Sequence, residues 1–101
     1  PLVTTDDIMG ELVALLTVRG IDRPRLLQFV DQIMRQPHLQ IIHIDEATLA
    51  EAWELLKRAD KTWSLVDACS FIVMRRLAIM EAFTSDHHFV QAGFIRVPHQ
   101  P

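Results

Sequence analysis

The sequence predicts an α/β fold in which helices cover a parallel sheet. Several long segments carry apolar residues at helical spacing, as Ile8, Leu12 and Leu15 do in the first of them. A short β-branched run at 39–44 is typical of a strand that is buried on both faces. Segments of helix length separate the expected strands, and connections of that length join parallel neighbours.

Each expected element has a start or stop signal beside it. A capping box of Thr4 and Asp7 begins the first helix, and Gly20 ends it. Pro24 fits the first turn of a second helix, which ends before Pro37. The other expected elements are a strand at 39–44, a helix at 46–59 with Leu49 and Trp53 facing inward, a helix from Ser64 to Leu77, strands at 82–84 and 94–97, and a short helix at 87–91.

Length and composition restrict the possible functions. The chain has 101 residues, enough for one small domain, so we expect residues 1–101 to form a single domain. The net charge is -3 and no single-sign run occurs, which argues against a broad electrostatic surface for nucleic acid but leaves room for a local acidic metal site. The single cysteine, Cys69, indicates a buried thiol in a reducing, cytoplasmic setting. No apolar stretch approaches the ~18 residues of a membrane span.

Two aspartates have positions that suggest chemistry. Asp67 lies inside an apolar helix, where an unpartnered carboxylate costs several kcal/mol, so it must be paired, bound to a metal or close to solvent. Ser64 and Asp67 also fit a capping box, which offers a structural role. Asp86 follows an expected strand, at the edge where open α/β sheets bind ligands. It fits the N-cap of the following short helix equally well.

The remaining polar candidates are weaker when taken alone. Glu11 lies at the border of the first helix's apolar stripe, where an acid is usually solvated. His87 and His88 are adjacent, a poor spacing for joint ligation, and are interpreted as surface histidines of a loop. His43 shows no partner pattern.

The stretch from Trp63 to Phe94, WSLVDACSFIVMRRLAIMEAFTSDHHFVQAGF, closely resembles the C-terminal half of PIN-domain proteins, most of all the VapC-type toxin ribonucleases and their bacterial and archaeal relatives. The upstream stretch PLVTTDDIMGEL resembles the family segment that carries a helix-borne glutamate, here Glu11. The matching positions are Ser64, Asp67, Ser70, Thr84, Asp86, Phe89 and the triplet Ala92, Gly93 and Phe94.

The resemblance implies a three-layer α/β/α sandwich and an endoribonuclease that depends on Mg²⁺ or Mn²⁺. Glu11, Asp67 and Asp86 would be its catalytic and metal-binding acids, since carboxylates gathered in one pocket repel one another unless a cation neutralises them. Glu11 would hold or deprotonate the attacking water, and Thr84 and Ser64 would orient the carboxylates.

The family's first acidic residue belongs to an N-terminal strand that has no counterpart in this sequence. We therefore expect an N-terminally truncated PIN domain whose sheet exposes unpaired backbone and favours a homodimer. The expected partners are an RNA substrate and an antitoxin, with no membrane. Two alternatives stay open: a PIN-like module that binds RNA or protein without cutting, and a dimerising protein whose acids only cap helices.

Overall fold

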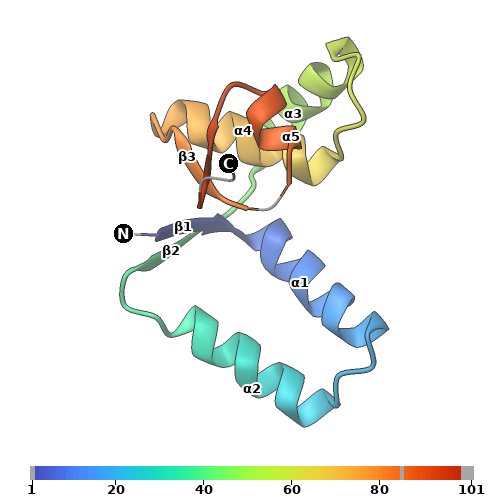
Figure 1. The fold of residues 1–101 in the computed structure, drawn as a ribbon, viewed down its shortest axis with the longest axis vertical. Helices are drawn as coiled ribbons and strands as arrows, with labels where there is room; N and C mark the ends of the chain where they lie inside the picture. Colours follow the sequence, from blue (N-terminus) through green and yellow to red (C-terminus); the bar gives the residue numbers. More distant parts are fainter. Residues whose placement is uncertain (1, 85, 99–101) are drawn as a thin grey trace. The chain divides into compact units, whose positions relative to one another are not determined.

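The computed structural model of the protein describes residues 2–84 and 86–98, which form five helices and four strands in these two stretches (Figure 1). The chain divides into two units, Pro1–Ile44 and Asp45–Pro101, and each is described by itself. The predicted α/β class is confirmed, because helices connect the successive strands and both strand pairs are parallel. The strands form two separate two-stranded sheets, one in each unit.

The N-terminal unit pairs two helices with two strands. α2 returns along α1, and β1 and β2 lie side by side (Figure 1). Its elements are β1 (Leu2–Thr5), α1 (Asp6–Val18), α2 (Arg23–Met34) and β2 (Leu39–Ile42). Its core is formed by Met9, Leu26 and Val30, with the flanking side chains of Leu12, Val13, Leu16 and Ile33.

The start of α1 differs from the predicted capping box. Residues Leu2–Thr5 form a strand, and the N-cap is Thr5, whose side chain accepts the Ile8 N–H at 3.3 Å. The pairing of Thr4 with Asp7 was therefore wrong by one position. β-Branched residues such as Val3 and Thr4 suit a strand as well as a helix start, and parallel pairing with β2 decides between the two.

The strand expected at 39–44 is shorter and more exposed than predicted. β2 covers Leu39–Ile42 and pairs with β1, and Ile41 is 37% exposed. The expectation of burial on both faces was wrong. A run of isoleucines indicates a strand, but only neighbouring elements bury its faces.

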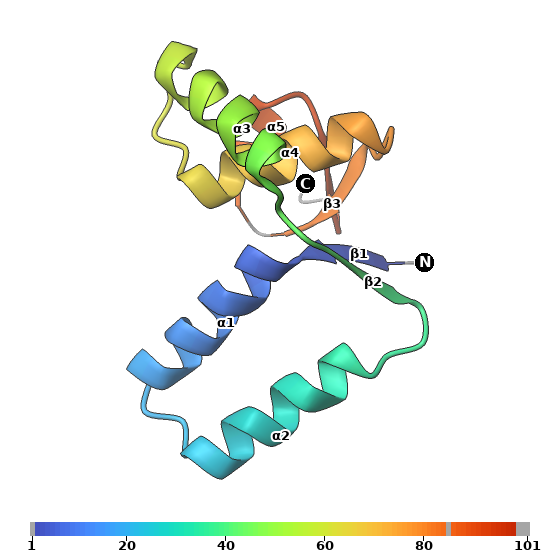
Figure 2. The same ribbon diagram turned by 180° about the vertical axis from the view of Figure 1, so that it is seen from behind.

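The C-terminal unit is built around a buried helix. α3 packs on α4 (Figure 2), and every residue from Ala68 to Met74 is buried. Phe71 is fully buried and gathers the apolar side chains of several elements around it. The elements are α3 (Glu46–Arg58), α4 (Leu65–Arg76), β3 (Glu81–Phe83), α5 (His88–Gln91) and β4 (Ile95–Val97).

The buried face of α3 is not the predicted one. Thr48 and Ala52 are buried, whereas Leu49 is 45% and Trp53 51% exposed. Small side chains let α3 approach α4 closely, and Arg76 of α4 donates to the Thr48 hydroxyl at 2.6 Å. Close helix contact and this hydrogen bond therefore outweigh the burial of the larger apolar side chains.

Within the described residues, no helix has both the length and the apolar character needed to cross a membrane.

Replacing Ala78 with glycine is expected to stabilise the C-terminal unit. Ala78 has a φ of 56° directly after α4, where the Ile79 N–H closes the helix on the Met74 carbonyl at 2.8 Å. A left-handed backbone strains alanine but not glycine, so Ala78→Gly should raise the free energy of unfolding by about 0.5–1 kcal/mol in urea titration. Ala50→Gly, in the exposed middle of α3, is the matched control and should lower it by about 1 kcal/mol. Destabilisation by both changes would contradict the strain at residue 78.

We expect Asp6 to make the N-terminal unit less stable to unfolding in acid than at neutral pH. The Ile44 N–H donates to its carboxylate at 3.1 Å, and this bond together with the neighbouring His43 lowers the pKa of Asp6. A lowered folded pKa stabilises the fold above the unfolded value of 3.8, and this stability is lost as pH falls below it. Asp6→Asn should therefore be less stable than the wild type near neutral pH, by under about 1 kcal/mol because the side chain is 41% exposed. In urea unfolding the two proteins should converge in acid, and a constant difference would contradict this role.

Candidate metal and active site

Asp67 lies at the start of α4 and is held there by a complete capping box. The Ser64 hydroxyl accepts the Asp67 N–H, and Asp67 Oδ2 accepts the Ser64 N–H, both at 3.0 Å. The predicted capping box of these two residues is confirmed. The Asp67 side chain is nevertheless 16% exposed, so part of the carboxylate reaches solvent. Because only Oδ2 takes part in the cap, Asp67 is able to serve a second role.

Asp86 lies between β3 and α5, in a turn that fixes its backbone. The Thr84 hydroxyl accepts the Asp86 N–H at 2.9 Å, and Asp86 Oδ1 accepts the His88 N–H at 2.9 Å. The N-cap position of α5 belongs to His87, so the predicted N-cap is shifted by one residue, although Asp86 does accept the first helical N–H. Its side chain is 38% exposed.

His88 joins the two aspartates. Its Nδ1 lies 3.0 Å from Asp67 Oδ2 and 3.3 Å from Asp86 Oδ1. Its side chain is only 18% exposed, so interpreting it as a surface histidine was wrong. The sequence signal that was missed is the spacing of Asp86 and His88, which puts an imidazole two residues after an acid at the end of a strand.

Aromatic packing behind the site fixes the two segments that supply these side chains. Phe89, the neighbour of His88, meets Phe71 edge to face at 5.0 Å, and Trp63 meets the same ring at 4.9 Å. The Trp63 Nε1–H also donates to Gln91 Oε1 at 3.1 Å. The short helix α5 is therefore held against Trp63 and Phe71 by the two residues Phe89 and Gln91, which follow His88.

Thr84 and Ser64, predicted to orient the carboxylates, act mainly through the backbone. Each hydroxyl accepts the N–H of an aspartate, which fixes the Cα from which the carboxylate extends. In addition, the backbone N–H of Ser64 donates directly to the carboxylate of Asp67.

Glu11 lies in the other unit. It is an exposed residue of α1, whereas Asp67 and Asp86 belong to the C-terminal unit. Each unit is described by itself, so the meeting of Glu11 with the two aspartates stays a prediction.

The donor set fits a hard divalent cation. Two carboxylates within 3.3 Å of one nitrogen are able to reach the same ion, and carboxylate oxygens are the ligands that Mg²⁺ and Mn²⁺ prefer. Asp86, His87 and His88 each offer one ligand atom within 4.8 Å of the others, although His87 is exposed. A site made only of nitrogen ligands would favour zinc. Here, by contrast, carboxylate oxygens supply ligands that carry negative charge.

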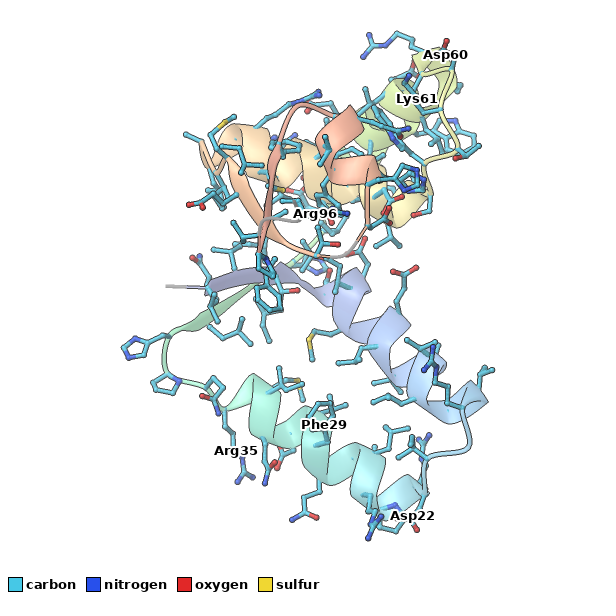
Figure 3. All side chains as sticks on the ribbon, in the orientation of Figure 1. Asp22, Phe29, Arg35, Asp60, Lys61 and Arg96 are labelled. Carbon is cyan, nitrogen blue, oxygen red and sulfur yellow. The ribbon has the colours of Figure 1, made fainter. Side chains whose placement is uncertain are left out.

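Two basic residues of the C-terminal unit, Arg76 and Lys61, differ in their surroundings. Arg76 is bound to α3, where it contacts Thr48 and lies 3.3 Å from Glu51. Lys61 lies beside Asp60 in the loop after α3 (Figure 3), and the 3.9 Å between Nζ and Oδ1 marks a loose, exposed pair. Lys61 is therefore the less tightly held of the two.

Comparison with known proteins places the chain in a family. The profile of the PIN domain matches residues 1–95 and so extends over parts of both units. The chain is 33% identical over 97 residues to the 23S rRNA-specific endonuclease VapC20 of two strains of Mycobacterium tuberculosis, covering 95% of this chain and 72% of that protein.

The fold agrees with the same relative. The crystal structure of Mycobacterium tuberculosis VapC20, described as a sarcin-ricin loop cleaving toxin, matches with a TM-score of 0.84 and 33% identity. The match covers 94% of this chain and 73% of that one. The PIN-like α/β fold expected from the sequence is thus confirmed, and the chain belongs to the PIN-domain family.

Proposed function

We propose that this protein is a metal-dependent endoribonuclease, the toxin of a toxin–antitoxin pair, which hydrolyses RNA phosphodiester bonds. The observation that carries the proposal is the meeting of Asp67 and Asp86 at one nitrogen atom of His88, in a chain of the PIN-domain family. A capping role explains the hydrogen bonds between Asp67 and Ser64, but it does not require Asp86 to lie beside Asp67.

Asp67 and Asp86 would hold the cation, and Glu11 would hold or deprotonate the attacking water. When bound, Mg²⁺ or Mn²⁺ lowers the pKa of water and stabilises charge on the leaving oxygen. Thr84 and Ser64 fix the backbone of the two ligands, so little reorganisation is needed when the cation enters. The family's further N-terminal acid would complete the site.

The named relatives suggest the first substrate and partner to test. They are called 23S rRNA-specific and sarcin-ricin loop cleaving, so a hairpin of that loop is the natural first substrate. We also propose an antitoxin partner, a homodimer and a cytoplasmic location. Support for a protein partner comes from α1 and α2, which expose large apolar side chains that such a partner would cover, namely Leu15, Val18, Leu27, Phe29 and Met34.

Asp67→Asn and Asp86→Asn should each lower the rate of RNA cleavage at least 100-fold, because an amide cannot supply the negative charge that holds the cation. The measurement is cleavage of a labelled hairpin with Mg²⁺ or Mn²⁺, beside calorimetric titration of the metal. Asp22→Asn is the matched control, since Asp22 is an exposed N-cap of α2 (Figure 3) and asparagine caps equally well. Full activity in both site variants would refute the assignment, and RNA binding that persists in EDTA without cleavage would favour a binding module.

The Glu11→Gln variant should distinguish a role of Glu11 in the chemical step from the metal-binding role proposed for the aspartates. A group that acts on the attacking water affects the chemical step more than metal affinity, so we expect kcat to fall about 100-fold while the Kd for Mn²⁺ changes by less than about tenfold. Unchanged kcat would exclude Glu11 from the site. An equal loss of metal affinity would instead make it a direct ligand.

A further inference from the structure

The hydrogen bonds around His88 define which ring nitrogen carries the proton. Nδ1 lies between two carboxylate oxygens, at 3.0 Å from Asp67 and 3.3 Å from Asp86. A bare nitrogen lone pair would repel both oxygens, whereas an N–H attracts both. On the other side of the ring, Nε2 lies 3.4 Å from the Thr62 hydroxyl, which is able to donate to it. These contacts together favour the tautomer with the proton on Nδ1.

The carboxylates use only one oxygen each in these contacts. Asp67 Oδ2 accepts the Ser64 N–H and contacts the His88 ring, and Asp86 Oδ1 accepts the backbone N–H of His88 and lies 3.3 Å from its Nδ1. Asp67 Oδ1 and Asp86 Oδ2 take part in none of these bonds. A carboxylate has lone pairs on both oxygens, so each aspartate is able to keep its contact with His88 and still offer an oxygen to a cation.

His88 itself has little freedom to move. The backbone N–H of His88 donates to Asp86 Oδ1, and the neighbouring Phe89 packs on the buried Phe71 ring. The side chain of His88 is itself largely covered. The repulsion between the two carboxylates is thus offset before a cation arrives by two groups of one fixed residue, the ring of His88 beside Asp67 and its backbone N–H on Asp86.

We propose that His88 is a positioning residue: its Nδ1–H draws the carboxylates of Asp67 and Asp86 to one point and so prepares them for the divalent cation. The inference rests on the proposed function, which it extends by a residue that does not need to touch the cation. His88 acts through the orientation of the two aspartates, so its loss should reduce metal affinity more than fold stability.

A pair of amide variants tests which ring nitrogen matters. The side-chain nitrogen of asparagine occupies nearly the place of Nδ1, whereas that of glutamine reaches the place of Nε2. His88→Asn should therefore bind Mn²⁺ within about threefold of the wild type, and His88→Gln should bind at least about tenfold more weakly, the scale typical of groups that orient a ligand. Electron paramagnetic resonance of Mn²⁺ measures the Kd directly, and His38→Gln, at an exposed position of the other unit, is the control.

The opposite order, with glutamine retaining affinity and asparagine losing it, would overturn the proposal by making Nε2 the functional atom. Equal affinity of all variants would overturn it as well. RNA cleavage by the same proteins should show the loss in His88→Gln as a raised metal requirement, with kcat restored at saturating Mn²⁺.

A second measurement needs no variant and no metal. Long-range ¹H–¹⁵N correlation spectra of the metal-free protein should show His88 with its proton on Nδ1, and a proton on Nε2 alone would overturn the proposal even if His88→Gln fails to fold. Different results refute the proposed function and the proposed role of His88. A wild type that binds no Mn²⁺ and cuts no RNA refutes the proposed function, whereas one that does both while His88→Gln matches it refutes only the role of His88.

Discussion

The main physical constraint on the C-terminal unit is that two carboxylates lie close together, and the contacts around His88 make this possible. Like charges a few ångströms apart repel strongly wherever water is partly excluded. Asp67 and Asp86 come from different segments, with 18 residues of sequence between them, and neither carboxylate is fully solvated. Hydrogen-bond donors from Ser64 and His88 offset this repulsion without consuming both oxygens of either acid.

The core packing makes this arrangement possible. Phe71 is fully buried one turn beyond Asp67 on α4, and Phe89 packs against it directly beside His88. The same ring therefore fixes the helix that carries the first acid and the short helix that follows the second. A four-residue helix such as α5 is not stable by itself, so its position depends on these aromatic contacts and on the Trp63 bond to Gln91. Stability and site geometry thus depend on the same residues.

Much of this could be predicted from the sequence, because local signals determine local structure. The spacing of Ser64 and Asp67 identified a capping box that the structure contains, and the apolar run after it identified a buried helix. The family pattern predicted both aspartates as site residues, and the structure places both beside one nitrogen of His88. The contact of His88 with Asp67 was missed because adjacent histidines were judged by their spacing along a helix, whereas the two residues are 21 positions apart in the sequence. The buried face of α3 was missed for a similar reason, since its choice depends on how closely α4 approaches.

Capping and metal binding are usually weighed as rival explanations of an acid at a helix start, but the geometry of Asp67 is compatible with both. The cap needs one carboxylate oxygen and fixes the side-chain torsions, so the second oxygen is held in place without further cost in conformational entropy. An acid that caps a helix beside a second acid is therefore better prepared as a ligand than one on a mobile loop, and the capping box belongs to the argument for the site.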